Sequence, residues 1–158
     1  MTIAISQDQI QIIVDRAENI YPEECCGILL GTISGSLKTV VEVIPTANVW
    51  VKSELGDDLA DPTEISRTKT SRYTIDPQDI FQATKRGRYL ELEIVGFFHS
   101  HPDNPAVPSI CDRDLAWHVY SYPIVSVMQG KVNDFKSWVL DDLGIFQQEE
   151  EISFLKLP

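Results

Sequence analysis

Two histidines, a serine and an aspartate lie close together in the chain, as His99, His101, Ser109 and Asp112. Two imidazoles and one carboxylate form the mixed ligand set of many catalytic zinc sites, which leave a fourth position for water. Because only one of these ligands is anionic, zinc keeps a net positive charge and lowers the pKa of a bound water to about 7. It then supplies hydroxide at neutral pH. The spacing therefore predicts a catalytic zinc site.

The spacing also indicates which elements position these side chains. Residues 92–98 are apolar and rich in β-forming types, which indicates a buried strand. Residues two apart on a strand point to the same face, so His99 and His101 project together from the strand end. If Ser109 caps a helix, its side chain and that of Asp112 face the strand end from the first turn. We therefore expect three ligands and a hydroxyl around one point.

A longer pattern surrounds these residues. It reads His-x-His-Pro at residues 99–102, with Tyr-Pro-Glu-Glu-Cys-Cys-Gly upstream at residues 21–27. With this pattern the chain resembles the JAMM/MPN-plus metalloproteases, whose signature is a distant glutamate followed by histidines, serine and aspartate at these offsets. Weaker matches are Asn48 and the Arg-Tyr-Thr-Ile-Asp-Pro segment at residues 72–77. The resemblance extends over about residues 10–127.

The resemblance implies a role for each matched residue. It identifies Glu24 as the general base that takes a proton from the zinc-bound water and returns it to the leaving amine. It gives Ser109 a role beyond helix capping, which is to donate a hydrogen bond to a tetrahedral oxyanion. It implies one zinc ion per chain, held by His99, His101 and Asp112.

Composition and charge restrict the function further. The 158 residues are 43% hydrophobic and 23% charged, as in ordinary globular proteins. The formal charge of −11 argues against nucleic acid and anionic membranes as partners, because phosphate contacts rely on lysine and arginine. No long apolar run or signal-peptide pattern is evident. Three cysteines without a Cys-x-x-Cys pair do not form a disulfide framework, which favours the cytoplasm.

Periodicity predicts an α/β fold with a mixed sheet. Helices are expected at residues 8–21 and 76–86, the second beginning at Asp76-Pro77 and ended by Gly87. Strands are expected at residues 26–32, 38–45, 92–98, 124–128, 135–140 and 144–148. The resemblance implies a single domain with the MPN (JAMM) fold, a curved mixed sheet flanked by helices and similar to that of cytidine deaminases.

Residues 52–70 differ from the rest of the chain. They carry five acidic residues and few large apolar ones. Such a segment has little to bury and does not readily offset the entropy lost on ordering. We therefore expect one domain, residues 1–158, with a mobile acidic insertion at about residues 52–70 that folds over a substrate or attracts a basic partner.

The sequence therefore predicts a zinc-dependent peptidase or isopeptidase. The resemblance to stand-alone prokaryotic members implies small β-grasp substrates, either ubiquitin-like modifiers or sulfur-carrier proteins, cut after a Gly-Gly tail. A second copy of the chain is a further candidate partner. The principal alternative is a non-catalytic MPN scaffold, although members of that kind lose the ligands that stand here.

The sequence disfavours two other chemistries. A deaminase-like hydrolase is disfavoured because the His-x-Glu and Pro-Cys-x-x-Cys signatures are absent from the sequence. A cysteine nucleophile is disfavoured because Cys25 and Cys26 are adjacent and point in different directions on a strand. Cys111 is expected to face away from the metal site at its helical position.

Overall fold

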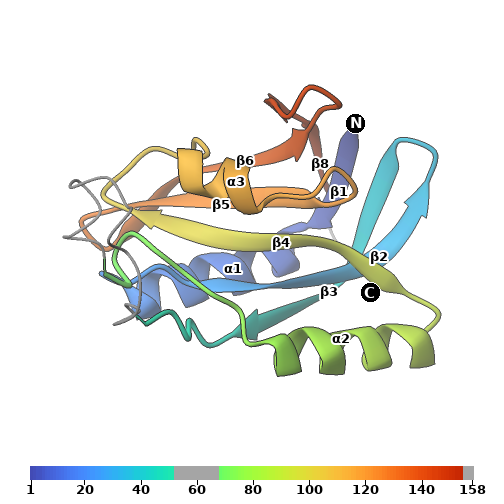
Figure 1. Cartoon of the computed structure of the whole chain (residues 1–158), viewed down its shortest axis with the longest axis horizontal. Coiled ribbons are helices and arrows are strands. Elements are labelled where there is room, and N and C mark those ends of the chain that lie inside the picture. Colours follow the sequence, from blue (N-terminus) through green and yellow to red (C-terminus); the bar gives the residue numbers. More distant parts are fainter. Residues whose placement is uncertain (52–67, 155–158) are drawn as a thin grey trace.

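In the described part of the chain, eight strands form one sheet and three helices accompany it (Figure 1). The elements of this computed structural model are β1 (Thr2–Ser6), α1 (Gln7–Ile20), β2 (Cys26–Ser34), β3 (Leu37–Thr46), α2 (Pro77–Tyr89), β4 (Glu93–Pro102), α3 (Ile110–Leu115), β5 (Ser121–Met128), β6 (Lys131–Leu140), β7 (Phe146–Gln148) and β8 (Glu150–Phe154). The structure describes residues 1–51 and 68–154. Most of the expected acidic insertion lies outside the described residues, so its mobility stays a prediction.

The sheet is curved, and its two edge strands, β7 and β8, follow one another in the chain. The strand order is β7-β6-β5-β4-β2-β3-β1-β8, with the pairs β4–β5, β1–β3 and β1–β8 parallel and the others antiparallel. Glu149 alone separates β7 from β8, and its backbone N–H donates to the Ser137 carbonyl of β6 at 3.0 Å. The predicted mixed α/β fold with a curved sheet is therefore confirmed.

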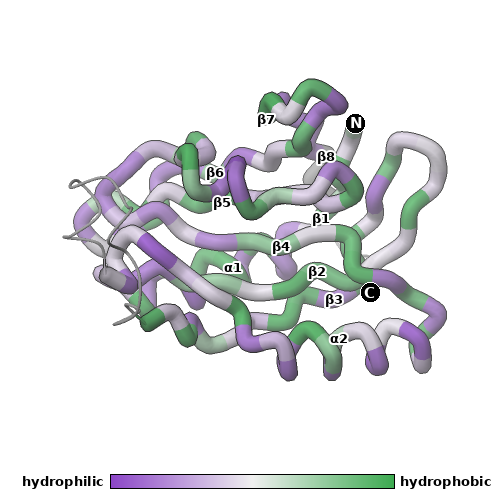
Figure 2. The backbone as a smooth tube through the Cα atoms, viewed as in Figure 1, coloured by the Kyte–Doolittle hydropathy of each residue, from purple (hydrophilic) through white to green (hydrophobic). Residues whose placement is uncertain are grey.

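The two long helices pack on opposite faces of the sheet. Ile13 and Ala17 of α1 join the larger core cluster with Leu29 of β2, whereas Ala83 of α2 packs with the neighbouring Leu30. Successive strand residues point to opposite faces, which explains how β2 serves both layers. Hydrophobic and hydrophilic segments alternate along α2, as its half-exposed position requires (Figure 2). None of the described helices has the length and apolar character needed to cross a membrane.

The ends of α2 confirm one prediction and correct another. Asp76 is the N-cap, with its carboxylate accepting from the Gln78 N–H at 2.9 Å, and Pro77 is the first helical residue. The prediction that Gly87 ends the helix is wrong, because α2 continues to Tyr89. Gly87 is needed for a different reason: a Cβ at this position would lie 2.8 Å from the backbone oxygen of Leu92. The glycine therefore allows a close approach between α2 and the chain entering β4.

A buried polar cluster lies where the sheet closes. Lys38 of β3 donates to the Ser121 hydroxyl at 3.0 Å, and Ser121 donates to the Glu149 carboxylate at 3.2 Å. Ser137 of β6 donates to the other oxygen of the same carboxylate. Burial raises the pKa of Glu149 and lowers that of Lys38. The Glu149 carboxylate thus connects β5 and β6 directly, and Lys38 of β3 through Ser121.

We predict that Glu149→Ala destabilises the fold. The substitution leaves two buried hydroxyls without their acceptor and the buried Lys38 without its neighbouring negative charge, which costs about 2–4 kcal/mol in the free energy of unfolding. Urea denaturation measures this loss. Glu150→Ala is the matched control, because Glu150 is exposed and its change should stay within about 0.5 kcal/mol. Equal midpoints for the two variants would show that the buried carboxylate has no such role.

Candidate active site

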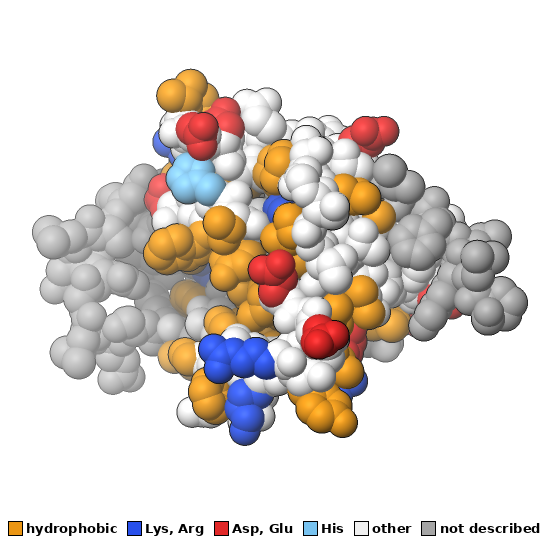
Figure 3. Space-filling model, turned by 90° about the vertical axis from the view of Figure 1, so that its right-hand side faces the viewer, with side chains coloured by type: hydrophobic (Ala, Val, Ile, Leu, Met, Phe, Trp, Pro, Cys, Tyr) orange, Lys and Arg blue, Asp and Glu red, His pale blue; other side chains and the backbone are white. Residues whose placement is uncertain are grey.

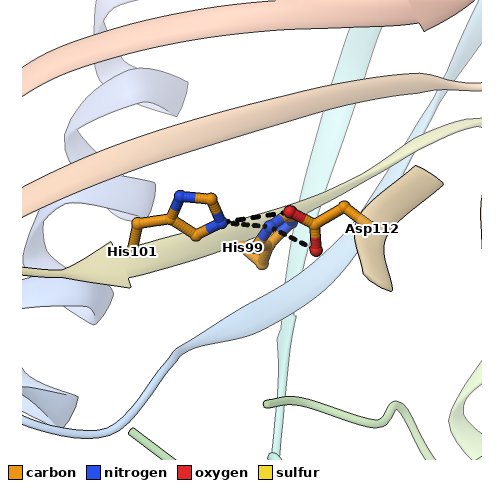
Figure 4. A group of neighbouring side chains, drawn as sticks. All are labelled: His99, His101 and Asp112. Carbon is orange, nitrogen blue, oxygen red and sulfur yellow. Dashed lines mark hydrogen bonds and ion pairs between the residues drawn. The ribbon is translucent and has the colours of Figure 1, made fainter. Parts of the chain in front are cut away.

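The two predicted histidine ligands lie in β4, which pairs with β2 on one side and β5 on the other. Both are buried. Their Nε2 atoms are 3.1 Å apart, and each lies 3.2 Å from one carboxylate oxygen of Asp112. Figure 4 shows the two rings of His99 and His101 and the carboxylate of Asp112 converging from β4 and α3. The structure therefore brings together the three residues that the sequence predicted as ligands.

These distances fit a bound metal ion. In tetrahedral zinc sites, bonds of about 2.0–2.1 Å place neighbouring ligand atoms roughly 3.3 Å apart. The separations of 3.1 and 3.2 Å within the cluster are close to that value. In the part of the chain that the structure describes, His99, His101 and Asp112 are the one such group of potential ligands. The donor set and its spacing are therefore suited to a small divalent cation.

A capping box positions Asp112. Ser109 is the N-cap of α3, and its hydroxyl accepts from the Asp112 N–H at 3.1 Å. In return the Asp112 carboxylate accepts from the Ser109 N–H at 2.7 Å. The two hydrogen bonds satisfy backbone donors of the first helical turn and orient the carboxylate toward the histidines. The prediction that Ser109 caps this helix is confirmed.

The backbone carbonyls of residues 104–106 each have a hydrogen-bond partner that helps to hold the segment between His101 and Ser109. The Pro105 carbonyl lies 2.8 Å from Nδ1 of His101, which makes it the partner of the ring nitrogen opposite Asp112. Ser126 donates to the Asn104 carbonyl at 2.7 Å, and Trp138 donates to the Ala106 carbonyl at 3.0 Å. Because α3 itself buries none of its residues, this connection is what places the helix.

Glu24 is buried two residues before the start of β2, whereas its neighbour Glu23 is exposed. The backbone N–H of Glu24 donates to the Lys69 carbonyl at 2.7 Å, and its carbonyl accepts from Asn48 at 3.1 Å. Burial is the main reason that its pKa rises to about 8. The nearby Asp112 acts in the same direction, while His101 and Arg72 oppose it. This carboxyl group is therefore able to hold and release a proton near neutral pH.

The protonation of the ligand cluster favours metal binding at two of its three residues. Burial lowers the pKa of His99, which outweighs the pull of Asp112 and keeps the imidazole neutral. Burial would raise the pKa of Asp112, but the two histidines and the Ser109 N–H hold it well below its usual range. Burial would lower the pKa of His101, but Asp112 and the Pro105 carbonyl raise it. A metal at this site therefore competes with a proton on His101.

A pocket of about 580 Å³ opens beside the cluster. Its walls include Glu24, His101 and Ser109, so a predicted ligand and both predicted catalytic residues face one space. Cys111 also lines this pocket, and the prediction that it faces away from the site is wrong. Because α3 is short and half-exposed, its first turn presents consecutive residues to the pocket. Exposed Ile110 adds an apolar wall.

The other two cysteines are structural. Cys25 and Cys26 are buried at the start of β2. Burial raises the pKa of the Cys25 thiol to about 12 and raises that of Cys26 as well. Both are therefore neutral thiols near pH 7, which agrees with the expectation that neither is a nucleophile.

A second pocket, of about 450 Å³, lies between α2, the start of β4 and the segment before β5. Its lining includes Ile33, Leu92, Ile94 and Tyr120. Figure 3 shows this side of the molecule, with hydrophobic side chains at its centre and Lys and Arg side chains near its lower edge. The ligand cluster takes no part in this pocket, so the chemistry belongs to the first.

The comparisons with known proteins agree with this site. A family model for prokaryotic homologs of the JAB domain matches residues 6–141. A desampylase from Haloferax volcanii is 30% identical over 106 residues, which are 66% of this chain and 63% of that protein. The chain thus spans less than two thirds of the length of this curated relative.

Solved structures resemble the fold as a whole. A protein from Desulfitobacterium hafniense is 28% identical, with a TM-score of 0.77 over 99% of this chain and 95% of the other. A JAB1/MPN domain protein from Archaeoglobus fulgidus is 18% identical, with a TM-score of 0.51 over 96% of this chain and 99% of the other, and it shares the fold. The residues that form the pocket and the ligand cluster all lie within the matched region, residues 6–141. The chain therefore belongs to the family of prokaryotic JAB-domain homologs.

Proposed function

We propose that the chain is a zinc-dependent metallopeptidase that hydrolyses peptide or isopeptide bonds. The observation that carries this proposal is the convergence of His99, His101 and Asp112 beside a pocket that is lined by His101 and the buried Glu24. His99, His101 and Asp112 would hold one ion per chain. A zinc ion held there would supply Lewis acidity, polarising a carbonyl and lowering the pKa of a bound water to about 7.

Glu24 is the general base in this proposal. Its pKa of about 8 in the metal-free chain means that it binds a proton readily, and a cation held by the nearby ligands would lower that pKa. The carboxylate takes a proton from the attacking water and then returns it to the departing amine. Hydrogen bonds from Asn48 and to Lys69 on either side of its backbone keep Glu24 at the pocket wall.

Ser109 stabilises the oxyanion in this proposal. Its hydroxyl oxygen already accepts from the Asp112 N–H, which leaves its own O–H free to donate. Because Ser109 is exposed and lines the pocket, this O–H is able to reach a carbonyl oxygen of a bound substrate. The same residue therefore caps α3 and donates to the tetrahedral intermediate.

We propose a small ubiquitin-like or sulfur-carrier protein of the β-grasp type as the substrate, cut after its Gly-Gly tail in the cytoplasm. The desampylase among the relatives supports this class of substrate. A pocket with polar and apolar walls is also suited to an extended main chain without large side chains. A non-catalytic scaffold is not favoured, because the complete ligand set and a buried acid would have no role in it.

We predict that purified protein contains close to one equivalent of zinc per chain and that His101→Ala removes most of it. Loss of one of three protein ligands leaves too few donors for tight binding. Metal analysis after gel filtration measures the content. His118→Ala is the matched control, because this exposed histidine lies outside the cluster. Unchanged zinc in a variant lacking both His99 and His101 would disprove the site.

We predict that Glu24→Gln retains zinc but lowers the cleavage rate by about 10²–10⁴-fold, the usual cost of losing a general base. The assay incubates candidate carrier proteins that bear C-terminal extensions and detects the released fragments by mass spectrometry. Glu23→Gln is the matched control, since Glu23 is exposed. Full activity in Glu24→Gln together with loss in Glu23→Gln would show that the adjacent acid is the base.

The raised pKa of Glu24 also predicts a pH effect on the metal-free protein. An acid whose folded pKa of about 8 exceeds its ordinary value of 4.5 stabilises the fold below the ordinary value and loses that effect as the pH rises toward 8. Wild-type protein in chelator should therefore lose stability relative to Glu24→Gln between about pH 5 and pH 8. Urea denaturation of both proteins tests this. Parallel stability curves would contradict the burial of an ionisable group at this position.

A further inference from the structure

The two histidines of the cluster are oriented in different ways. His101 has the usual arrangement, in which the ring nitrogen opposite the ligand cluster faces a carbonyl, here that of Pro105 at 2.8 Å. His99 lacks this arrangement. Among the described residues, its buried Nδ1 has no hydrogen-bond partner. The neutral tautomer that presents a lone pair on Nε2 therefore carries an Nδ1 proton without an acceptor among the described residues, and no hydrogen bond at Nδ1 fixes the rotation of the ring.

An aromatic ring lies against His99 instead. The ring of Tyr73 stacks on the imidazole with centroids 4.5 Å apart and planes inclined by 23°. Such offset stacking is favourable and depends on the mutual orientation of the rings. The flat face of Tyr73 therefore packs along the plane of the imidazole in which Nε2 points at His101 and Asp112.

The side chain of Asn48 holds the segment that carries Tyr73, through hydrogen bonds that we call the Asn48 bracket. The Asn48 side chain donates to the Arg72 carbonyl at 2.9 Å and accepts from the Thr74 N–H at 3.1 Å, which secures the backbone on both sides of Tyr73. The same amide donates to the Glu24 carbonyl at 3.1 Å. One asparagine therefore sets the position of the stacking ring and of the buried acid together.

We propose that Tyr73 is a positioning residue for the metal site, which orients His99 by stacking in place of the missing hydrogen bond. This inference rests on the proposed function only in assuming that the cluster binds a metal. In this proposal the aromatic face of Tyr73 orients His99, and the Tyr73 hydroxyl has no part in it. Asn48 acts indirectly, by holding the backbone of the segment that carries the Tyr73 ring.

Zinc affinity of the purified protein, measured by competition with a chromophoric chelator, tests the proposal. Tyr73→Leu keeps an apolar side chain but removes the flat ring, and we expect about 10-fold to 100-fold weaker binding, the usual effect of losing a residue that orients a ligand. Tyr73→Phe keeps the ring and should bind within about threefold of wild type. Phe97→Leu is the matched control, because it removes an aromatic ring of β4 that packs against Tyr120 and Tyr122.

A spectroscopic measurement separates orientation from general loosening of the fold. Cobalt(II) bound in place of zinc has visible absorption bands that report ligand geometry. We expect Tyr73→Leu to change the bands, while Tyr73→Phe and Phe97→Leu leave them as in wild type. Thermal unfolding identifies any variant that fails to fold. If Tyr73→Leu is such a variant, Asn48→Ser provides the same test, because it releases the bracket and keeps the ring.

The outcomes distinguish this proposal from the proposed function. Wild-type protein that binds no zinc would overturn both. Zinc binding by wild type with equal affinity in folded Tyr73→Leu would overturn the role of Tyr73 and leave the peptidase proposal intact. Equal losses in Tyr73→Phe and Tyr73→Leu would assign the effect to the hydroxyl and overturn the stacking argument. A loss in Phe97→Leu as large as that in Tyr73→Leu would also overturn it.

Discussion

The pairing of β2 with β4 is the constraint on which the site depends. Cys26 is in register with His99, and one residue further out the backbones of Cys25 and Ser100 remain connected. The Ser100 N–H donates to the Cys25 carbonyl at 3.1 Å, and the Ser100 hydroxyl accepts from the Cys25 N–H at 2.8 Å. Because side chains alternate along a strand, the Ser100 side chain points to the face of β4 opposite the two histidines. There its hydroxyl holds the chain that enters β2. This junction places Glu24 beside the ligands, although about 75 residues of chain separate them.

The chemistry of the site follows from burial around that junction. An acid in water would be ionised at neutral pH, but burial raises the pKa of Glu24 to about 8, and burial keeps His99 neutral. Asp112 stays ionised in the same surroundings because it accepts from the Ser109 N–H and faces two imidazoles. Three neighbouring groups therefore differ in proton affinity because their partners differ. Such separation of pKa values is typical of sites that transfer protons.

The strands that close the sheet contribute none of the described residues that form the candidate site. The matched family region is residues 6–141, whereas β7, β8 and the junction at Glu149 lie beyond it, and most of β1 precedes it. The pairing of β1 with β8 therefore joins two segments that lie mostly outside the shared region. The buried Glu149 carboxylate, also outside that region, accepts from Ser121 and Ser137 within it. Their contribution is to the stability of the curved sheet, at the opposite end of β4 from the histidines, because Ser121 pairs with Gly96.

The local features of the site were predictable from sequence because their contacts span two or three residues. The spacing of His99 and His101 on a strand and the capping box at Ser109 need no distant partner. The stacking of Tyr73 on His99, the bracket at Asn48 and the strands at both ends of the chain depend on partners far away in sequence. Propensity and periodicity do not describe such contacts. They also predict a helix end at Gly87, because they do not show that its missing side chain allows the close approach of the Leu92 backbone. The sequence by itself indicated the proposed ligand set, and tertiary packing decided its orientation, because only a folded sheet brings an acid, a ring and two imidazoles together.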